Sequence, residues 1–283
     1  MFNKAYVEIT NVCNLACSFC PGTIRRPRFL SPEEFTRVLS QLQGRARQLY
    51  FHVMGEPLLH PQLGELLRMA GEAGFPVNLT TNGRLLARRL PELTGASSLR
   101  QVNLSLHSDQ SGDDTWLMEV LHAVAALRAA RPVLVSLRLW NLREDPAANE
   151  ARIRRIAEHF HAPLPLPRDR TGYKLGDGLW VNEGEVFDWP SLGTIECDEA
   201  GKSRGEASFC RGLRDQVAIL CDGTVTACCL DAEGALALGN VFAEDLDDIL
   251  QRPRARAIVD GFSQRRAVEA LCQRCGYRER FSK

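Results

Sequence analysis

Short apolar runs alternate with amphipathic segments over roughly the first two thirds of the chain. Short apolar runs are typical of buried strands, and apolar residues spaced three and four apart are typical of helices that pack on one face. Strands are expected at residues 5–9, 48–54, 76–81, 101–108, 133–140 and 179–181, and helices at 31–43, 61–73, 84–94, 115–130 and 147–160. This alternation predicts an α/β protein with a parallel sheet and outer helices, arranged as a partial (βα)6 TIM-like barrel.

The start of the first helix has a clear signature. Ser31 occupies the N-cap, Pro32 the first helical position, and Glu34 completes a capping box. Ser at the N-cap and Glu three residues later can satisfy each other's free backbone N–H groups. The helix is therefore expected to begin at this point.

The pattern changes after about residue 190. Residues 198–208 are polar, and residues 217–229 consist of two apolar runs joined by Asp222-Gly223, a strong hairpin signal. A further helix is expected from about Leu246. We therefore predict two domains, a barrel at 1–190 and a small α+β domain at 191–283.

Composition and charge exclude several classes of protein. The 283 residues include equal numbers of basic and acidic side chains, 35 of each, which argues against binding nucleic acid in bulk. No apolar run is long enough to span a membrane, and the N-terminus lacks a secretory pattern, so we expect a cytoplasmic protein. Ten cysteines in such a protein are better interpreted as ligands than as disulfides.

Three of these cysteines follow the first expected strand with the spacing Cys13-x3-Cys17-x2-Cys20. Parallel α/β folds bind ligands at the carboxyl ends of their strands, so this loop is well placed for a site. Structural zinc sites use four protein ligands, whereas three thiolates suit a [4Fe-4S] cluster with one open iron. A zinc-binding or redox-inert loop remains the alternative.

The cysteine spacing, its place after the first strand and Phe19 beside Cys20 resemble the radical S-adenosylmethionine (SAM) superfamily. The resemblance implies that SAM occupies the fourth iron through its amino and carboxylate groups. It also implies reductive cleavage of SAM to a 5′-deoxyadenosyl radical, with a flavodoxin or ferredoxin-type protein as the reductant. Phe19 corresponds to the aromatic residue whose backbone contacts the adenine.

Further positions match motifs of the same family. Gly55-Glu56-Pro57 resembles the Gly-Gly-Glu-Pro motif that receives the SAM ammonium, with Met54 in place of the first glycine. The resemblance assigns the remaining cofactor contacts to Asn82, Ser105, His107 and Arg138, with Ser105 and His107 expected on the fourth strand. Each of these could instead serve a turn, a backbone hydrogen bond or a structural ion pair.

A second cysteine set follows residue 190. Cys210 precedes Gly223-x4-Cys228, and Cys272-x2-Cys275 lies near the C-terminus. This arrangement resembles the SPASM domain and its shorter relative Twitch, which implies a second, auxiliary [4Fe-4S] cluster. A four-cysteine zinc site is the alternative. Cys221, Cys229 and Cys197 are expected to be core or inert thiols, although Cys221 could replace an assigned ligand.

Three features of the sequence bear on the class of substrate. Many peptide-modifying relatives carry an N-terminal leader-binding domain, for which Cys13 leaves no room, and this favours a small-molecule substrate. Several arginines could bind a phosphate or carboxylate: Arg25, Arg26, Arg28, Arg168, Arg170, Arg211 and Arg214. The chain resembles the queuine-lyase group, which implies release of queuine from queuosine or its 5′-phosphate. The alternatives are a peptide maturase and a non-catalytic iron–sulfur electron carrier.

Overall fold

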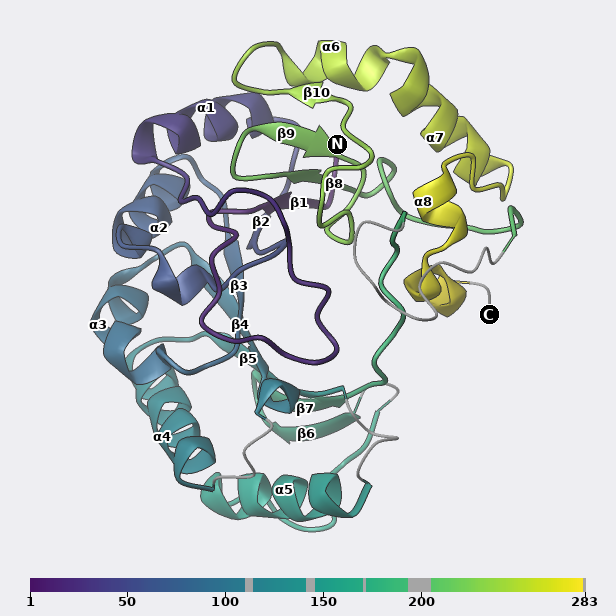
Figure 1. The fold of residues 1–283 in the computed structure, drawn as a ribbon. Helices are drawn as coiled ribbons and strands as arrows, with labels where there is room; N and C mark the ends of the chain where they lie inside the picture. The colour runs from purple at the N-terminus through teal and green to yellow at the C-terminus, as the bar shows by residue number, and fades with distance from the viewer. Residues whose placement is uncertain (110–113, 141–145, 170–171, 193–204, 282–283) are drawn as a thin grey trace.

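A computed structural model describes residues 1–109, 114–140, 146–169, 172–192 and 205–281. Its centre is one ten-stranded sheet in the order β10-β9-β8-β1-β2-β3-β4-β5-β7-β6 (Figure 1). The strands are β1 Lys4–Val7, β2 Leu49–Phe51, β3 Val77–Thr81, β4 Leu99–Ser105, β5 Leu134–Leu139, β6 Gly172–Gly176, β7 Leu179–Glu183, β8 Gln216–Ile219, β9 Thr224–Thr226 and β10 Gly239–Asn240. Neighbouring strands from β8 through β5 to β7 run parallel, while β6, β9 and β10 pair antiparallel.

Helices α1 to α5 follow β1 to β5 in turn and cover the outer side of the curved sheet (Figure 1). Their bounds are α1 Pro32–Leu42, α2 Leu63–Glu72, α3 Leu86–Gly95, α4 Asp114–Ala130 and α5 Pro146–His159. The C-terminal helices are α6 Leu246–Gln251, α7 Pro253–Ser263 and α8 Ala270–Gln273. The predicted α/β class with a partial barrel is confirmed. The expected sixth strand is β7, and the antiparallel β6 beside it was not expected.

The predicted start of α1 is also confirmed. The Ser31 hydroxyl accepts a hydrogen bond from the Glu34 N–H, and the Glu34 carboxylate accepts one from the Ser31 N–H. Phe35 and Val38 then turn toward the sheet and are fully buried. The cap therefore fixes where the helix begins, and its apolar face anchors it against the core.

Alternation along the strands separates the core from the interior of the barrel. In β5, Leu137 and Leu139 are fully buried in the main core, while Arg138 between them lines the interior cavity. In β1, Val7 joins the same core, while Tyr6 lines the cavity. The polar and aromatic positions of the strands are thus collected on the concave side.

The C-terminal segment extends the same sheet. The predicted hairpin consists of β8 and β9, and β8 pairs in parallel with β1 from Gln216 opposite Lys4 to Ile219 opposite Val7. Gly223 turns the hairpin at φ +84°, and a Cβ there would lie 2.5 Å from the Asn240 Oδ1 atom. The predicted boundary at residue 190 therefore falls within a chain whose sheet is continuous across both parts.

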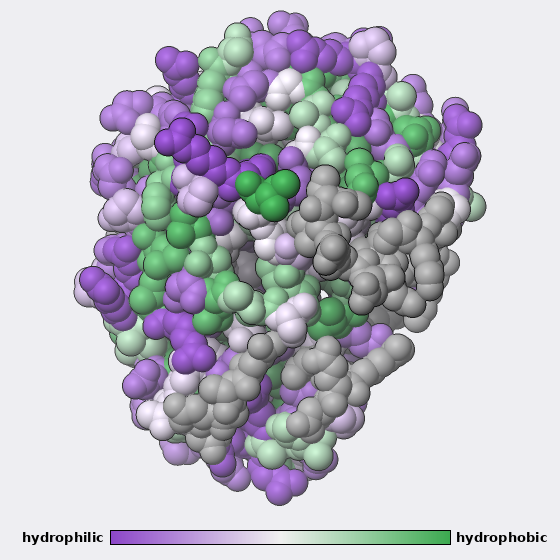
Figure 2. Space-filling model, in the orientation of Figure 1, coloured by the Kyte–Doolittle hydropathy of each residue, from purple (hydrophilic) through white to green (hydrophobic). Residues whose placement is uncertain are grey.

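One face of the molecule shows how hydrophilic and apolar side chains are distributed over the surface (Figure 2). Figure 2 shows hydrophilic side chains around the periphery of that face and apolar ones nearer its centre. In the described part of the chain, no helix is both long enough and apolar enough to cross a membrane.

Candidate functional site

One cavity of about 750 Å³ connects the two cysteine sets. Its wall is formed by the concave side of the sheet, the loop after β1 and the C-terminal elements. The thiols that line it are Cys13, Cys17, Cys20, Cys210, Cys228, Cys229, Cys272 and Cys275. Cysteines up to 262 positions apart in the sequence (Cys13 and Cys275) therefore share one space.

The first thiol set lies on the loop that leaves the carboxyl end of β1. Cys13 and Cys20 are exposed and Cys17 is half-buried, and all three are free thiols. Although Cys13 is exposed as a residue, its sulfur is partly desolvated, which raises the pKa of Cys13, and the nearby Glu56 carboxylate and Cys20 thiol add to this effect. The three sulfurs therefore lie close enough to interact with one another, and a bound cation or iron centre would stabilise their thiolate forms.

Gly55 holds this loop against the turn after β2. Its φ is +76°, and a Cβ at this position would lie 2.4 Å from the Thr10 carbonyl oxygen and 2.8 Å from the Asn11 carbonyl carbon. The Glu56 N–H also donates to the Val12 carbonyl oxygen at 2.8 Å. Only glycine allows this close approach, so Gly55 sets the distance between the thiol loop and the turn.

Glu56 is a buried carboxylate that accepts three hydrogen bonds from the protein. It is 2% exposed, its Oε1 accepts from the Thr81 hydroxyl (2.7 Å) and the Leu58 N–H (2.9 Å), and its Oε2 accepts from the Asn82 N–H (2.7 Å). Burial raises its pKa, and these hydrogen bonds oppose the rise. No basic side chain of the described residues forms an ion pair with it, so it can accept a cationic group from a ligand in the cavity.

Asn82 links the turn after β3 to the thiol loop. Its side-chain amide donates to the Asn14 side-chain oxygen at 2.9 Å, and its own oxygen accepts from the Arg84 N–H. Pro57 begins the short 3-10 helix Pro57–Leu59 and is buried. Asn82 thus lies next to the thiol loop and on the cavity wall, whereas Pro57, also predicted as a cofactor contact, does not line the cavity.

His107 does not lie on the fourth strand as predicted. β4 ends at Ser105, and His107 belongs to the 3-10 helix Leu106–Ser108 that follows it. Its ring lies between Phe19 (5.0 Å between ring centroids) and Trp140 (5.7 Å, stacked). The sequence pattern missed the early end of β4 because Leu104 and Leu106 are both buried and alternate as they would in a strand.

The protonation state of His107 follows from its contacts. Burial lowers its pKa to about 4, and the positive charges of Arg138 and Arg152 add to the effect. Its Nδ1 lies 3.1 Å from the Arg138 carbonyl oxygen, which can only accept, so Nδ1 carries the proton. The neutral ring therefore offers Nε2 as an acceptor.

Ser105 and Arg138 lie side by side on β4 and β5, and both line the cavity. The Arg138 guanidinium stacks over the Trp140 ring at 5.0 Å, and burial lowers its pKa. Within the described ranges no carboxylate forms an ion pair with it, and the titratable side chains that act on it are tyrosines and a cysteine, which are neutral near neutral pH. An anionic group in the cavity would therefore find an unpaired cation there.

The second thiol set surrounds the other part of the cavity. Cys228 lies two residues after β9, Cys272 in α8 and Cys275 just after it, while Cys210 precedes β8. Burial raises the pKa of Cys228, and the thiols of Cys210, Cys272 and Cys275 add to the effect. The four predicted ligands therefore lie together, and all are free thiols.

The other cysteines have separate environments. Cys221 is 1% exposed, donates its N–H to Glu8 and receives a contact from Arg25, so it cannot replace a ligand of the second set without moving. Cys229 was expected in the core; it packs against the small buried cluster that includes Tyr6, and it also lines the cavity. Cys197 lies outside the described residues.

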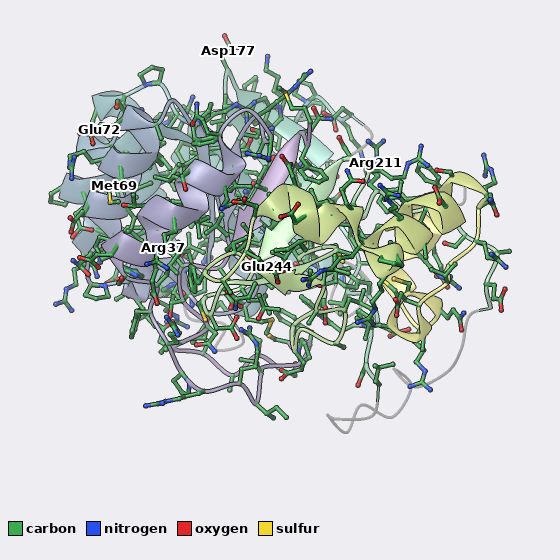
Figure 3. All side chains as sticks on the ribbon, turned by 90° about the horizontal axis from the view of Figure 1, so that it is seen from above. Arg37, Met69, Glu72, Asp177, Arg211 and Glu244 are labelled. Carbon is green, nitrogen blue, oxygen red and sulfur yellow. The ribbon has the colours of Figure 1, made fainter. Side chains whose placement is uncertain are left out.

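Most arginines considered for anion binding are already paired. The ion pairs are Arg25–Glu8, Arg28–Glu34, Arg168–Glu183 and Arg211–Asp215, while Arg214 contacts the Phe209 ring and the Ser263 hydroxyl. Arg170 lies outside the described residues. Arg211, labelled in Figure 3, lies on the side of the C-terminal helices, opposite Glu72 of α2. Arg138 is thus better placed to receive an anion than these paired residues.

Sequence reasoning missed the buried ion pair that holds the thiol loop to the rest of the fold. Glu8 is fully buried and accepts from both terminal nitrogens of Arg25 (2.8 and 2.6 Å), from the Met54 N–H (3.1 Å) and from the Cys221 N–H (3.1 Å). One carboxylate thus joins the thiol loop, the turn after β2 and the hairpin. A glutamate that continues an apolar strand, as Glu8 does, was the available signal.

Comparisons with known proteins agree with this geometry. Residues 7–145 match the radical SAM superfamily, and residues 210–276 match the SPASM family, an iron–sulfur cluster-binding domain. The chain belongs to the radical SAM superfamily. The second match begins at Cys210 and includes Cys275, so the two matches contain all seven predicted cluster ligands of this radical SAM protein.

Curated relatives match only part of the radical SAM chain. A GTP 3′,8-cyclase of Chlorobaculum tepidum is 38% identical over 104 residues, which is 35% of this chain and 31% of the relative. A PqqA peptide cyclase of Rhodopseudomonas palustris is 34% identical over 109 residues, which is 37% of this chain and 29% of the relative. The chain thus spans about a third of the length of these relatives.

Solved structures share the fold over nearly the whole chain. BtrN in complex with AdoMet and 2-DOIA has a TM-score of 0.61 at 16% identity and covers 97% of this chain and 93% of its own. SuiB of Streptococcus suis has a TM-score of 0.63 at 16% identity and covers 98% of this chain and 71% of its own. These likenesses extend through the C-terminal segment.

The residues present fit the cofactors that these domains imply. A radical SAM domain implies a [4Fe-4S] cluster and SAM, and a SPASM domain implies further iron–sulfur binding. Three free thiols beside a buried carboxylate suit the first group, and four free thiols suit a second. In the described ranges, no three His, Cys, Asp or Glu side chains converge as the ligands of a single metal ion do.

Proposed function

We propose that this chain is a radical SAM enzyme that acts on a substrate held in the cavity between two iron–sulfur sites. The single observation that carries the proposal is that both thiol sets, Glu56 and Arg138 line the same cavity of about 750 Å³. A [4Fe-4S] cluster on the first thiol set, with SAM bound, supplies a 5′-deoxyadenosyl radical that abstracts hydrogen from a substrate.

In this proposal the residues of the chain bind and orient SAM. Cys13, Cys17 and Cys20 hold the cluster, and Glu56 pairs with the SAM ammonium while Gly55 lets the backbone approach. Arg138, which has no carboxylate partner in the described part of the chain, pairs with the SAM carboxylate. The other SAM contacts are Phe19 to the adenine, and Asn82, Ser105 and His107 along the wall. Pro57 does not line the cavity, and in this proposal it supports Glu56 from the buried 3-10 helix that it begins.

Cys210, Cys228, Cys272 and Cys275 hold an auxiliary [4Fe-4S] cluster in the same proposal. Their mutual proximity and the match to the SPASM family support this assignment. A flavodoxin or ferredoxin-type protein supplies the electron. If the zinc alternative holds at the second set, metal analysis of the reconstituted chain will find zinc there in place of iron and sulfide.

For the substrate, we propose a small polar, phosphorylated or nucleoside-like molecule. The cavity supports this through its hydrogen-bonding wall of tyrosine, glutamine and histidine side chains, and BtrN, a fold neighbour, was solved with 2-DOIA. Queuosine 5′-phosphate remains our specific prediction, although neither the GTP 3′,8-cyclase nor the PqqA peptide cyclase is a queuine lyase. Peptide modification is the second candidate, because the chain shares 34% identity over 109 residues with that peptide cyclase.

The experiment is anaerobic incubation of reconstituted protein with SAM and dithionite. We expect 5′-deoxyadenosine from the wild type and none from Cys17→Ala, with Cys221→Ala as a control that leaves every proposed ligand in place. Absence of 5′-deoxyadenosine in the wild type would favour an electron carrier. Addition of queuosine 5′-phosphate should release queuine, and absence of the free base would exclude that substrate.

A further inference from the structure

Arg278 is a buried cation, and no carboxylate among the described residues neutralises its charge. It is 4% exposed and lies in the 3-10 helix Gly276–Phe281, which follows the last thiol of the second set. Its Nη2 donates to the Gly205 carbonyl oxygen at 2.6 Å. Its Nη1 is buried without a hydrogen-bond partner among the described residues, and no carboxylate there forms an ion pair with it. A desolvated guanidinium nitrogen of this kind is costly unless a ligand accepts from it.

Arg278 lies beside the second thiol set. It lines the cavity together with Cys210 and Cys275, and it is close enough to both sulfurs for its charge to act on them. A positive charge in this position favours any added negative charge on a group that these sulfurs hold.

Backbone donors reinforce this edge of the thiol set. The backbone N–H groups of Tyr277 and Arg278 lie near the Cys275 sulfur, and those of Arg211 and Gly212 lie near the Cys210 sulfur. Cys272 lies instead near the carboxylates of Glu269 and Asp231. Positive charge and N–H donors are therefore concentrated at Cys210 and Cys275.

We propose that Arg278 directs its unpartnered Nη1 at the auxiliary iron–sulfur cluster and sets that cluster's reduction potential. The inference rests on the proposed iron–sulfur occupancy of the second thiol set. Reduction adds one negative charge to a cluster, and a nearby guanidinium together with N–H donors stabilises that charge. Arg278 thus makes the auxiliary cluster a better electron acceptor and gives the second set a redox role beyond holding the fold together.

The test measures the midpoint potential of the auxiliary cluster alone. The full chain carries Cys13→Ala, Cys17→Ala and Cys20→Ala, so that only the second set binds a cluster, and is reconstituted anaerobically. A redox titration followed by electron paramagnetic resonance compares Arg278→Met, Arg278→Gln and Arg278→Lys with the parent. Arg256→Met is the matched control, because Arg256 is exposed on α7 and its loss removes the same charge away from the site.

We expect Arg278→Met and Arg278→Gln to shift the potential to more negative values, Arg278→Lys to shift it less, and Arg256→Met to leave it unchanged. Iron and sulfide content shows whether each variant holds its cluster. If Arg278→Met loses iron, the comparison with the parent relies on Arg278→Gln. A potential equal to the parent in both neutral variants would overturn the proposal, as would zinc at the second set. Failure of SAM cleavage is a separate outcome, because it concerns the first set and is measured in the wild type.

Discussion

Glu56 and Arg138 place opposite charges on the wall of one cavity, and this matches a zwitterionic ligand. Glu56 is held by three protein donors, and Arg138 is held by stacking on Trp140. Neither side chain forms an ion pair with another residue in the described part of the chain. A ligand with an ammonium and a carboxylate would therefore satisfy both groups.

Glu56→Gln should weaken SAM binding about tenfold, because the amide cannot pair with the ammonium as a charged group. Burial raises the pKa of Glu56 above the ordinary range of a glutamate. The wild-type affinity should therefore fall on acidification earlier than an exposed carboxylate would allow, and the variant should lack this pH dependence. Anaerobic calorimetry with SAM measures both effects, with the exposed Glu65→Gln as control. Equal affinities of the wild type and Glu56→Gln would contradict the assignment.

His52 gives the chain a predictable sensitivity to acid. Its Nδ1 is buried without a partner among the described residues, and burial lowers its pKa from 6.5 to about 3, with Arg138 and Lys4 adding to the shift. The unfolded chain therefore binds this proton more readily than the native state, and the free energy of unfolding falls as the pH drops below the unfolded pKa. The loss should reach roughly 2 kcal/mol by about pH 5.

His52→Phe should remove this loss. The substituted ring keeps the edge contacts with Tyr6 and Tyr50 but has no titrating nitrogen. Anaerobic urea unfolding at about pH 7 and about pH 5 measures the difference for each variant, and the exposed His122→Ala is the control. An equal loss of stability in the wild type and His52→Phe would show that other groups titrate.

At this scale the sequence predicted the ligand residues better than their surroundings. Spacing was enough to select Cys13, Cys17 and Cys20, because three thiols within eight residues of one loop can reach the same metal centre when the loop folds back on itself. The roles of Cys229 and Arg278 could not be predicted, because both depend on which face of a distant element turns toward the cavity. Arg278 follows Cys275 closely in sequence, yet only the fold shows that its Nη1 lacks a partner among the described residues.

The elements around the first thiol set are held by contacts that cross the sequence. Gly55 approaches the backbone of the thiol loop, and Glu8 joins that loop to the turn after β2 and to the hairpin at Cys221. The sequence predicted a strand before the loop and a turn at Gly55-Glu56-Pro57. It did not predict that β1 ends at Val7, because the apolar run continues past Glu8 to Ile9, and it could not show which groups the Glu8 carboxylate would meet.

Gly55→Ala should displace the thiol loop, because the added Cβ would lie 2.4 Å from the Thr10 carbonyl oxygen at a positive φ. We expect the iron content of the first site to fall by at least about half, with a loss of roughly 1–3 kcal/mol in the free energy of unfolding. Gly74→Ala is the matched control, since Gly74 has a φ of +79° but no atom within 4 Å of an added Cβ. Iron analysis and urea unfolding distinguish the two variants, and a normal iron content in Gly55→Ala would refute the close-approach argument.

At the scale of the whole molecule, the parallel pairing of β8 with β1 makes the second thiol set part of the barrel wall. The strand–helix alternation and the C-terminal hairpin could each be predicted from their own sequences. The pairing of β8 with β1 could not, because the sequence of a hairpin does not show which edge of a sheet it joins. Because the sheet is continuous, the two thiol sets open into one cavity while drawing their ligands from separate segments. Metal binding at one set should therefore not require the other.

Removing either set should leave the other one loaded. Reconstituted wild-type protein should hold about eight irons, as two [4Fe-4S] clusters require. About four irons per chain should remain when Cys13, Cys17 and Cys20 are all replaced by Ala. The same number should remain when the second set is replaced by Ala instead, at Cys210, Cys228, Cys272 and Cys275. Cys221→Ala should keep about eight, because Cys221 contacts Glu8 and Arg25 rather than either thiol set. Iron and sulfide analysis with visible absorption measures this, and a wild type with about four irons would show that the second set holds no such cluster.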